Sequence, residues 1–167
     1  MLTAITLVSL GLLALLACYA AYTDFTQYRI PNRVSLAVLF LFIPYVIAHP
    51  DPADLYLNLL VAAGVFAVGF LFFVKGWMAG GDVKLMTVVA LWAGPQLVLP
   101  FLLVTSLAGG FFAILMYGHT RFGLSLAVGR LGLNRLQAIL LNTKIPYGIA
   151  ICFGTFFVVW QLVSQVP

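Results

Sequence analysis

Charged residues are scarce in this sequence. Only 7% of its 167 residues are charged and 64% are hydrophobic, whereas soluble globular domains carry about 25% charged residues. A folded chain of this composition would have too few charged residues to cover a surface that faces water. A soluble enzyme and a disordered tail are therefore excluded. A nucleic-acid-binding module is excluded for the same reason, although the net charge is +4. The composition indicates an integral membrane protein.

Metal-binding and redox-active residues are also few. Glutamate is absent, and there are only two cysteines and two histidines. Cys18 and Cys152 form no CxxC motif, so we expect buried helix-packing residues rather than a zinc site or a structural disulfide. His49 and His119 fall in different connections between apolar runs and are not expected to share an ion. We therefore expect neither a metal nor a cofactor.

Long apolar runs are abundant. A membrane-spanning helix needs about 20 apolar residues, and we expect six spans, at residues 2–22, 31–48, 55–74, 82–93, 96–117 and 145–160. The fourth covers only about 17 Å, because Gly94-Pro95 stops it. Residues 118–143 are expected to lie on the membrane surface. The first run has no basic start, so we interpret it as a retained helix and not as a signal peptide. The predicted fold is an all-α polytopic membrane bundle in one domain, residues 1–167.

The basic residues indicate the orientation in the membrane. All eight fall in the first, third and fifth connections: Arg29, Arg33, Lys75, Lys84, Arg121, Arg130, Arg135 and Lys144. Basic residues in short loops stay on the cytoplasmic side. Both termini are therefore predicted to be periplasmic and these three connections cytoplasmic. As topology determinants, the basic residues need not bind anything.

Four aspartates are the only acids of the chain. Two lie in the outward connection beside prolines and are expected to be solvated: Asp51 and Asp54. Asp24 and Asp82 lie instead on the cytoplasmic side, where an apolar helix meets a basic connection. Ionisable residues near membrane depth are often functional. The alternative is that each acid pairs with a nearby base, Asp24 with Arg29 and Asp82 with Lys84.

Small residues precede Asp82 in the segment Ala79-Gly80-Gly81-Asp82. Glycine lets the backbone approach a ligand or a neighbouring helix closely. The short helix that follows would leave a wet recess, where irregular backbone is tolerated. Two carboxylates that meet there can share a proton, so that one acts as a base toward water and the other donates to a substrate carbonyl. This is the chemistry of aspartic proteases, and it requires no metal.

Three segments carry a resemblance to a known family: DFTQYRIPN at residues 24–32, GGDVKL at residues 80–85 and KIPYG at residues 144–148. Together they resemble the motifs of prepilin peptidases, which are intramembrane aspartyl peptidases of the GxGD class. One departure is Ala79, which stands where the GxGD motif has its first glycine. Larger members also carry a methyltransferase region with paired CxxC motifs. This chain is similar to the short form that serves tight-adherence (Flp) pili and to archaeal preflagellin peptidases, so N-methylation would need another protein.

The resemblance implies that Asp24 and Asp82 form the catalytic pair of a GxGD-type bundle. It implies supporting or substrate-binding roles for Gly80, Gly81, Lys84, Pro31, Asn32, Pro146, Tyr147 and Gly148. The enzyme would be a multi-pass protease of the bacterial inner membrane. It would remove the basic leader of type IV prepilins on the cytoplasmic side, typically after a Gly that precedes the apolar stretch.

Two other functions compete with this hypothesis. A small proton-coupled transporter would also use intramembrane acids, but no acid lies in the outer halves of the expected spans. A non-catalytic subunit of a pilus or secretion assembly would tolerate the loss of both Asp24 and Asp82. Beyond the prepilin, the expected partners are membrane lipid and a second copy of the chain, because Gly64, Gly69, Gly109 and Gly110 allow close helix packing.

Overall fold

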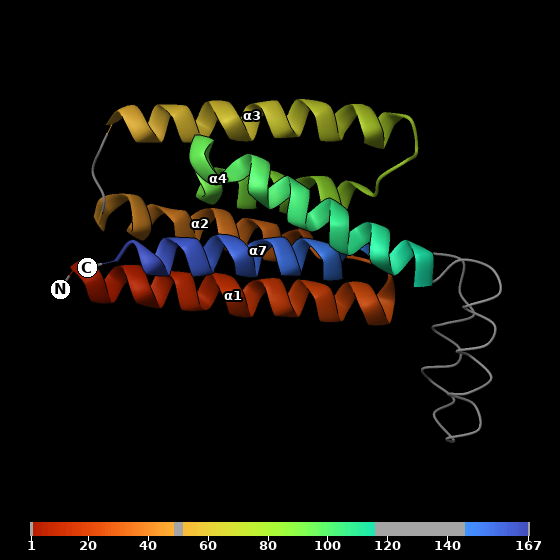
Figure 1. The fold of residues 1–167 in the computed structure, drawn as a ribbon, viewed down its shortest axis with the longest axis horizontal. Helices are drawn as coiled ribbons and strands as arrows, with labels where there is room; N and C mark the ends of the chain where they lie inside the picture. Colours follow the sequence, from red (N-terminus) through yellow and green to blue (C-terminus); the bar gives the residue numbers. More distant parts are fainter. Residues whose placement is uncertain (1, 49–51, 116–145, 167) are drawn as a thin grey trace, which may run out of the picture.

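The computed structural model describes residues 2–48, 52–115 and 146–166, and most of these residues are helical. The helices are α1 (Leu2–Gln27), α2 (Asn32–Ala48), α3 (Pro52–Val74), α4 (Gly80–Leu115) and α7 (Tyr147–Ser164). They lie side by side as a bundle, with the two marked chain ends at the same end (Figure 1). The predicted all-α fold is confirmed.

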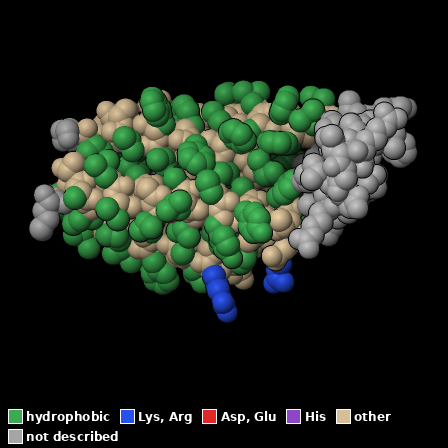
Figure 2. Space-filling model, turned by 90° about the horizontal axis from the view of Figure 1, so that it is seen from below, with side chains coloured by type: hydrophobic (Ala, Val, Ile, Leu, Met, Phe, Trp, Pro, Cys, Tyr) green, Lys and Arg blue, Asp and Glu red, His purple; other side chains and the backbone are tan. Residues whose placement is uncertain are grey.

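Helix length and surface chemistry identify an integral membrane protein. Among the described helices, α1, α4, α7 and residues 54–74 of α3 are long and apolar enough to cross a membrane. Helix α2 is apolar but shorter, at 17 residues. Figure 2 shows a face covered by hydrophobic side chains, with basic side chains at one edge. Such a surface suits lipid, because a bilayer core offers no water to solvate polar groups.

Helix α4 differs from the prediction, because it joins two expected spans in one element that is interrupted at Gly94. This residue has φ 60° and ψ −171°, a conformation open essentially to glycine alone. The chain doubles back here, since Asp82 before the break and Gly109 after it line the same recess. Asn58 of α3 packs so closely against Gly94 that a side chain there would collide with it. The expected stop at Gly94 is confirmed. We call the two halves the first arm (80–93) and the second arm (95–115).

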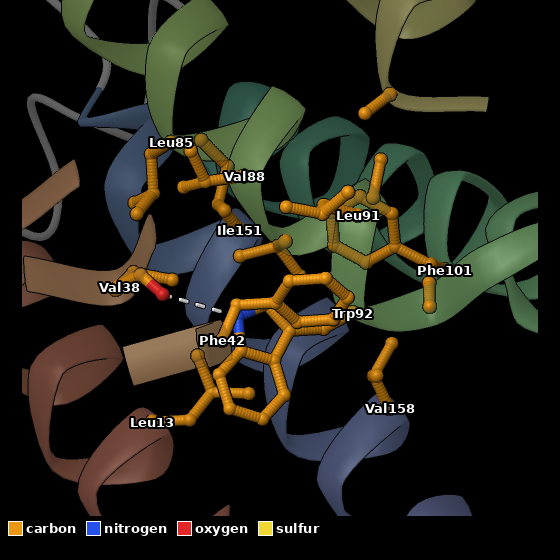
Figure 3. Close-up of a cluster of buried hydrophobic side chains, with 14 of the residues drawn as sticks. Leu13, Val38, Phe42, Leu85, Val88, Leu91, Trp92, Phe101, Ile151 and Val158 are labelled. Atoms are coloured by element: carbon orange, nitrogen blue, oxygen red, sulfur yellow. Dashed lines mark hydrogen bonds between the residues drawn. The ribbon is translucent and has the colours of Figure 1, made fainter. Parts of the chain in front are cut away.

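An aromatic cluster fixes the first arm against α2 (Figure 3). Trp92 is only 2% exposed, and its indole Nε1–H donates a hydrogen bond to the carbonyl oxygen of Val38 at 3.2 Å. Its ring packs edge-on against Phe42, with 5.4 Å between centroids, and also contacts Tyr45 at 4.9 Å. Aromatic pairs of this kind contribute about 0.5–1.5 kcal/mol beyond area burial. The far end of the first arm is thus anchored, which holds Asp82 at its other end.

Helix α1 buries one stripe against α2 and α7. Buried positions recur at alternating spacings of three and four residues, and they continue to the end of the helix: Leu10, Leu13, Ala17, Ala20 and Asp24. Positions with this spacing share one face of a helix. Cys18 falls off the stripe and is exposed, whereas Cys152 of α7 is buried, and both are free. The expectation of buried cysteines is right for Cys152 and wrong for Cys18.

Candidate active site

Asp24 lies on the buried stripe of α1, near the end of the helix, and is 6% exposed. Four residues later Tyr28 adopts a positive φ of 51°, which is uncommon for a residue with a side chain. The Tyr28 N–H still donates to the Asp24 carbonyl oxygen, at 2.8 Å. The left-handed turn ends α1 and directs the chain toward Ile30 and α2. Asp24 is therefore held by regular helix on one side and by this turn on the other.

Asp82 lies in the first turn of α4 and is 4% exposed. The Val83 N–H donates to the Ala79 carbonyl oxygen at 3.2 Å, and the Asp82 carboxylate accepts a hydrogen bond from the Ala79 backbone. An acid in this position satisfies a free N–H at the helix start and interacts favourably with the helix dipole. Ala79 itself is exposed, so its methyl group is accommodated where the GxGD motif has glycine.

The amino end of α7 brings the two aspartates into one site. The Gly148 N–H donates to Oδ2 of Asp24 at 2.7 Å, although the residues are 124 positions apart. Tyr147, the preceding residue, lines a recess together with Asp82. The Asp24 carboxylate is near enough to Asp82 for its charge to act on that group. Three elements that are distant in sequence therefore converge at one end of the bundle.

Two glycines allow this convergence. A Cβ atom on Gly148 would lie 2.7 Å from Cβ and 3.0 Å from Oδ2 of Asp24. A Cβ atom on Gly81 would lie 3.2 Å from Cβ of Ile30 and 3.3 Å from its carbonyl oxygen. Any side chain at these positions would push apart the elements that carry the acids. A Cβ atom on Gly80 would instead lie 3.3 Å from Cε2 of the Phe73 ring.

Lys84 links the two aspartate motifs without contacting the acid in its own segment. Its Nζ donates to Oδ1 of Asn32 at 3.0 Å. Asn32 is the first residue of α2, and the preceding Pro31 offers its carbonyl oxygen to the N–H of Val34 at 3.0 Å. The partner of Lys84 is thus an amide and not Asp82. Pairing with Lys84 does not account for the burial of Asp82.

A recess of about 240 Å³ adjoins Asp82. The first arm, the second arm and α7 line it, and its walls include Met86, Thr105, Gly109, Gly110 and Tyr147. Sequence reasoning missed the second arm as part of the site and treated Gly109 and Gly110 only as packing residues. Small residues at 106, 109, 110 and 113 were the available signal, because this spacing places them on one helix face.

Asp54 lies away from the two buried aspartates. Asp54 is exposed in the first turn of α3 and lines a hollow with Gly94. Since Gly94 lies about 18 Å along the first arm from Asp82, Asp54 belongs to the opposite end of the bundle. Pro146 is buried beside α7. The predicted surface segment 118–143 lies outside the described residues, as do several residues named in the sequence analysis: His49, Asp51, His119, Arg121, Arg130, Arg135 and Lys144.

Comparison with known protein families gives a match over much of the chain. The model of the type IV leader peptidase family matches residues 11–114. The matched region contains both buried aspartates and ends in the second arm of α4. No curated protein and no solved structure matches the chain.

Proposed function

Because the chain belongs to the type IV leader peptidase family, we propose that Asp24 and Asp82 are the catalytic pair with which it cleaves its substrate. Members of this family are aspartic-type prepilin leader peptidases, so the protein is an aspartic endopeptidase and its substrate is a pilin precursor. The observation that carries the assignment is the convergence of the two buried acids at the start of α7, where the Gly148 N–H donates to Asp24 and Tyr147 lines the recess that Asp82 also lines.

In the proposed mechanism the two carboxylates share one proton. The ionised aspartate removes a proton from water, and the water oxygen attacks the carbonyl carbon of the scissile bond. The protonated aspartate donates its proton to the carbonyl oxygen, which gives a tetrahedral intermediate. When the intermediate collapses, the C–N bond breaks and the leaving nitrogen takes up a proton. The Gly148 N–H fixes one carboxylate oxygen of Asp24, so the other remains available to water or substrate.

The proposed topology places this chemistry at the cytoplasmic face of the inner membrane. We infer that the chain crosses the membrane six times. The six crossings are α1, α2, α3, the first arm of α4, the second arm of α4 and α7. The ends of α1 and α3 and the starts of α4 and α7 share one end of the bundle (Figure 1). Lys84 lies at that end, and basic residues mark the cytoplasmic side. A precursor with a basic leader in the cytoplasm and an apolar stretch in the bilayer would present its scissile bond there.

Precursor cleavage by aspartate variants tests the proposal. The enzyme is co-expressed with a candidate prepilin, and cleavage is scored by mobility shift in membranes with matched protein levels. Asp24→Asn and Asp82→Asn should each abolish cleavage. The double variant should be barely worse than either single one, because groups that act as a unit are strongly non-additive. Asp54→Asn is the matched control at the opposite end and should cleave normally. Substantial turnover by either single variant at the proposed pair would refute it.

A further inference from the structure

The recess beside Asp82 is wider and less polar than a water site would require. At about 240 Å³ it exceeds an apolar cavity of about 150 Å³, which is large enough to hold benzene. Apart from Asp82, its walls contain no charged side chain. The space therefore suits an aromatic ring or a branched aliphatic side chain beside the reacting groups.

An apolar path continues from this recess. Met78, Met86 and Ser106 also line a second hollow of about 330 Å³, which lies between α3 and the arms of α4. The wall of that hollow is apolar and includes Val68 and Phe72 of α3. Methionine side chains adapt easily to irregular partners, so Met78 and Met86 form a deformable divider between the two spaces. An apolar peptide segment that begins beside Asp82 has room to continue toward α3.

Gly110 lies on the wall of the recess formed by the second arm. A Cβ atom on Gly110 would meet no atom within 4 Å, whereas one on Gly109 would lie 3.5 Å from the Tyr147 ring. A larger side chain at position 110 is therefore accommodated by the fold but takes up free space. The absence of a side chain at this position keeps the recess wide.

We propose that this recess is the subsite for the precursor side chain on the apolar side of the scissile bond, and that Gly110 determines the size of side chain it accepts. The proposal rests on the assignment of Asp24 and Asp82 as the catalytic pair. The occupant is the first residue of the apolar stretch, and the hollow against α3 receives the residues that follow. Gly110 acts as a specificity determinant and takes no part in bond cleavage.

The test compares two precursors that differ only in the residue after the scissile bond, Phe in one and Ala in the other. The ratio of kcat/KM for the Phe precursor to that for the Ala precursor is measured for wild type, Gly110→Ala and Gly110→Leu. Gly110→Leu should lower this ratio by about tenfold or more, as expected when a pocket loses the volume of several carbon atoms. The ratio for Gly110→Ala should lie between those for wild type and Gly110→Leu. Gly11→Leu is the matched control, because Gly11 is also an exposed helical glycine with no atom within 4 Å of a Cβ.

An unchanged ratio in active Gly110→Leu enzyme would overturn the subsite and leave the catalytic pair intact. An equal loss for both precursors would overturn it as well, because the substitution would then act on the enzyme in general. If Gly110→Leu fails to insert, the ratio for Gly110→Ala decides in the same way. Failure of the catalytic pair would be recognised separately, by cleavage in the Asp24→Asn or Asp82→Asn enzyme.

Discussion

Replacing Gly148 by alanine adds one methyl group where α7 meets Asp24. The new Cβ would lie 2.7 Å from Cβ, 3.2 Å from Cγ and 3.0 Å from Oδ2 of the aspartate. Carbon atoms pack favourably at about 3.5–4.0 Å, so the overlap is close to 1 Å. The Cβ atom of Asp24 is fixed to the α1 backbone, and rotation of the carboxylate does not relieve its clash. Helices α1 and α7 must therefore separate locally.

The separation should lower both stability and activity. Overpacking typically costs about 1–3 kcal/mol of folding free energy, and the 2.7 Å hydrogen bond from Gly148 is weakened at the same time. A displacement of about 1 Å at a catalytic group can lower the rate about 100-fold. We therefore expect the Gly148→Ala enzyme to insert normally and to cleave prepilin about 100-fold more slowly than wild type.

Initial rates of precursor cleavage in detergent, at equal enzyme concentration, measure this effect. Thermal unfolding of the same samples separates a local displacement from general misfolding. Gly11→Ala is the control for the added methyl group, because a Cβ atom there meets nothing within 4 Å. A wild-type rate for Gly148→Ala would refute the catalytic role proposed for Asp24 at this contact.

Three further predictions concern topology, metal dependence and the motif residues. A reporter active only outside the cytoplasm should be active when fused after Pro167 and silent when fused between Phe122 and Leu133; the reverse at both sites would contradict the orientation. Chelator should leave cleavage unchanged, since the described residues contain no group of three His, Cys or Asp that could hold a metal; loss of activity that zinc restores would overturn the aspartyl mechanism. Lys84→Ala should reduce activity only partly, because Lys84 contacts Asn32 and not an acid. Gly81→Val should reduce activity more, because a Cβ atom at position 81 would lie 3.2 Å from Ile30. An inactive Lys84→Ala enzyme together with a normal Gly81→Val enzyme would contradict both expectations.

Local features of this fold could be predicted from the sequence. Gly94 requires a positive φ, and the sequence marks it through the Gly-Pro pair that ends a short apolar run. The acids Asp24 and Asp82 were identified by their place at helix ends. The spacing of Asp24 from Leu13 and Ala20 also fits the buried stripe. These features depend on residues close together in the chain, where the physical preferences of each residue act directly.

Long-range packing could not be predicted in the same way. Leu13 is fully buried and Leu15 is 66% exposed, yet both are leucines in one apolar helix. Because lipid accepts apolar side chains as readily as a protein core does, hydrophobicity does not separate inward from outward positions. The contact of Gly148 with Asp24 and the recess along the second arm depend on which helix faces are paired. The exposure of Cys18 was missed for the same reason.

The anchoring of Trp92 has a consequence for how the two ends of the bundle are kept apart. Polar side chains line the hollow around Gly94, among them Asn58, Gln96 and Gln165, while Asp82 lies about 18 Å away at the other end of the first arm. Trp92 forms part of the wall of this hollow and is 2% exposed. Its ring packs against Phe42 and Tyr45, and buried apolar side chains of the first arm continue from it toward Asp82, among them Leu85, Val89 and Leu91. The polar groups at the two ends of the arm are therefore separated by packed apolar side chains.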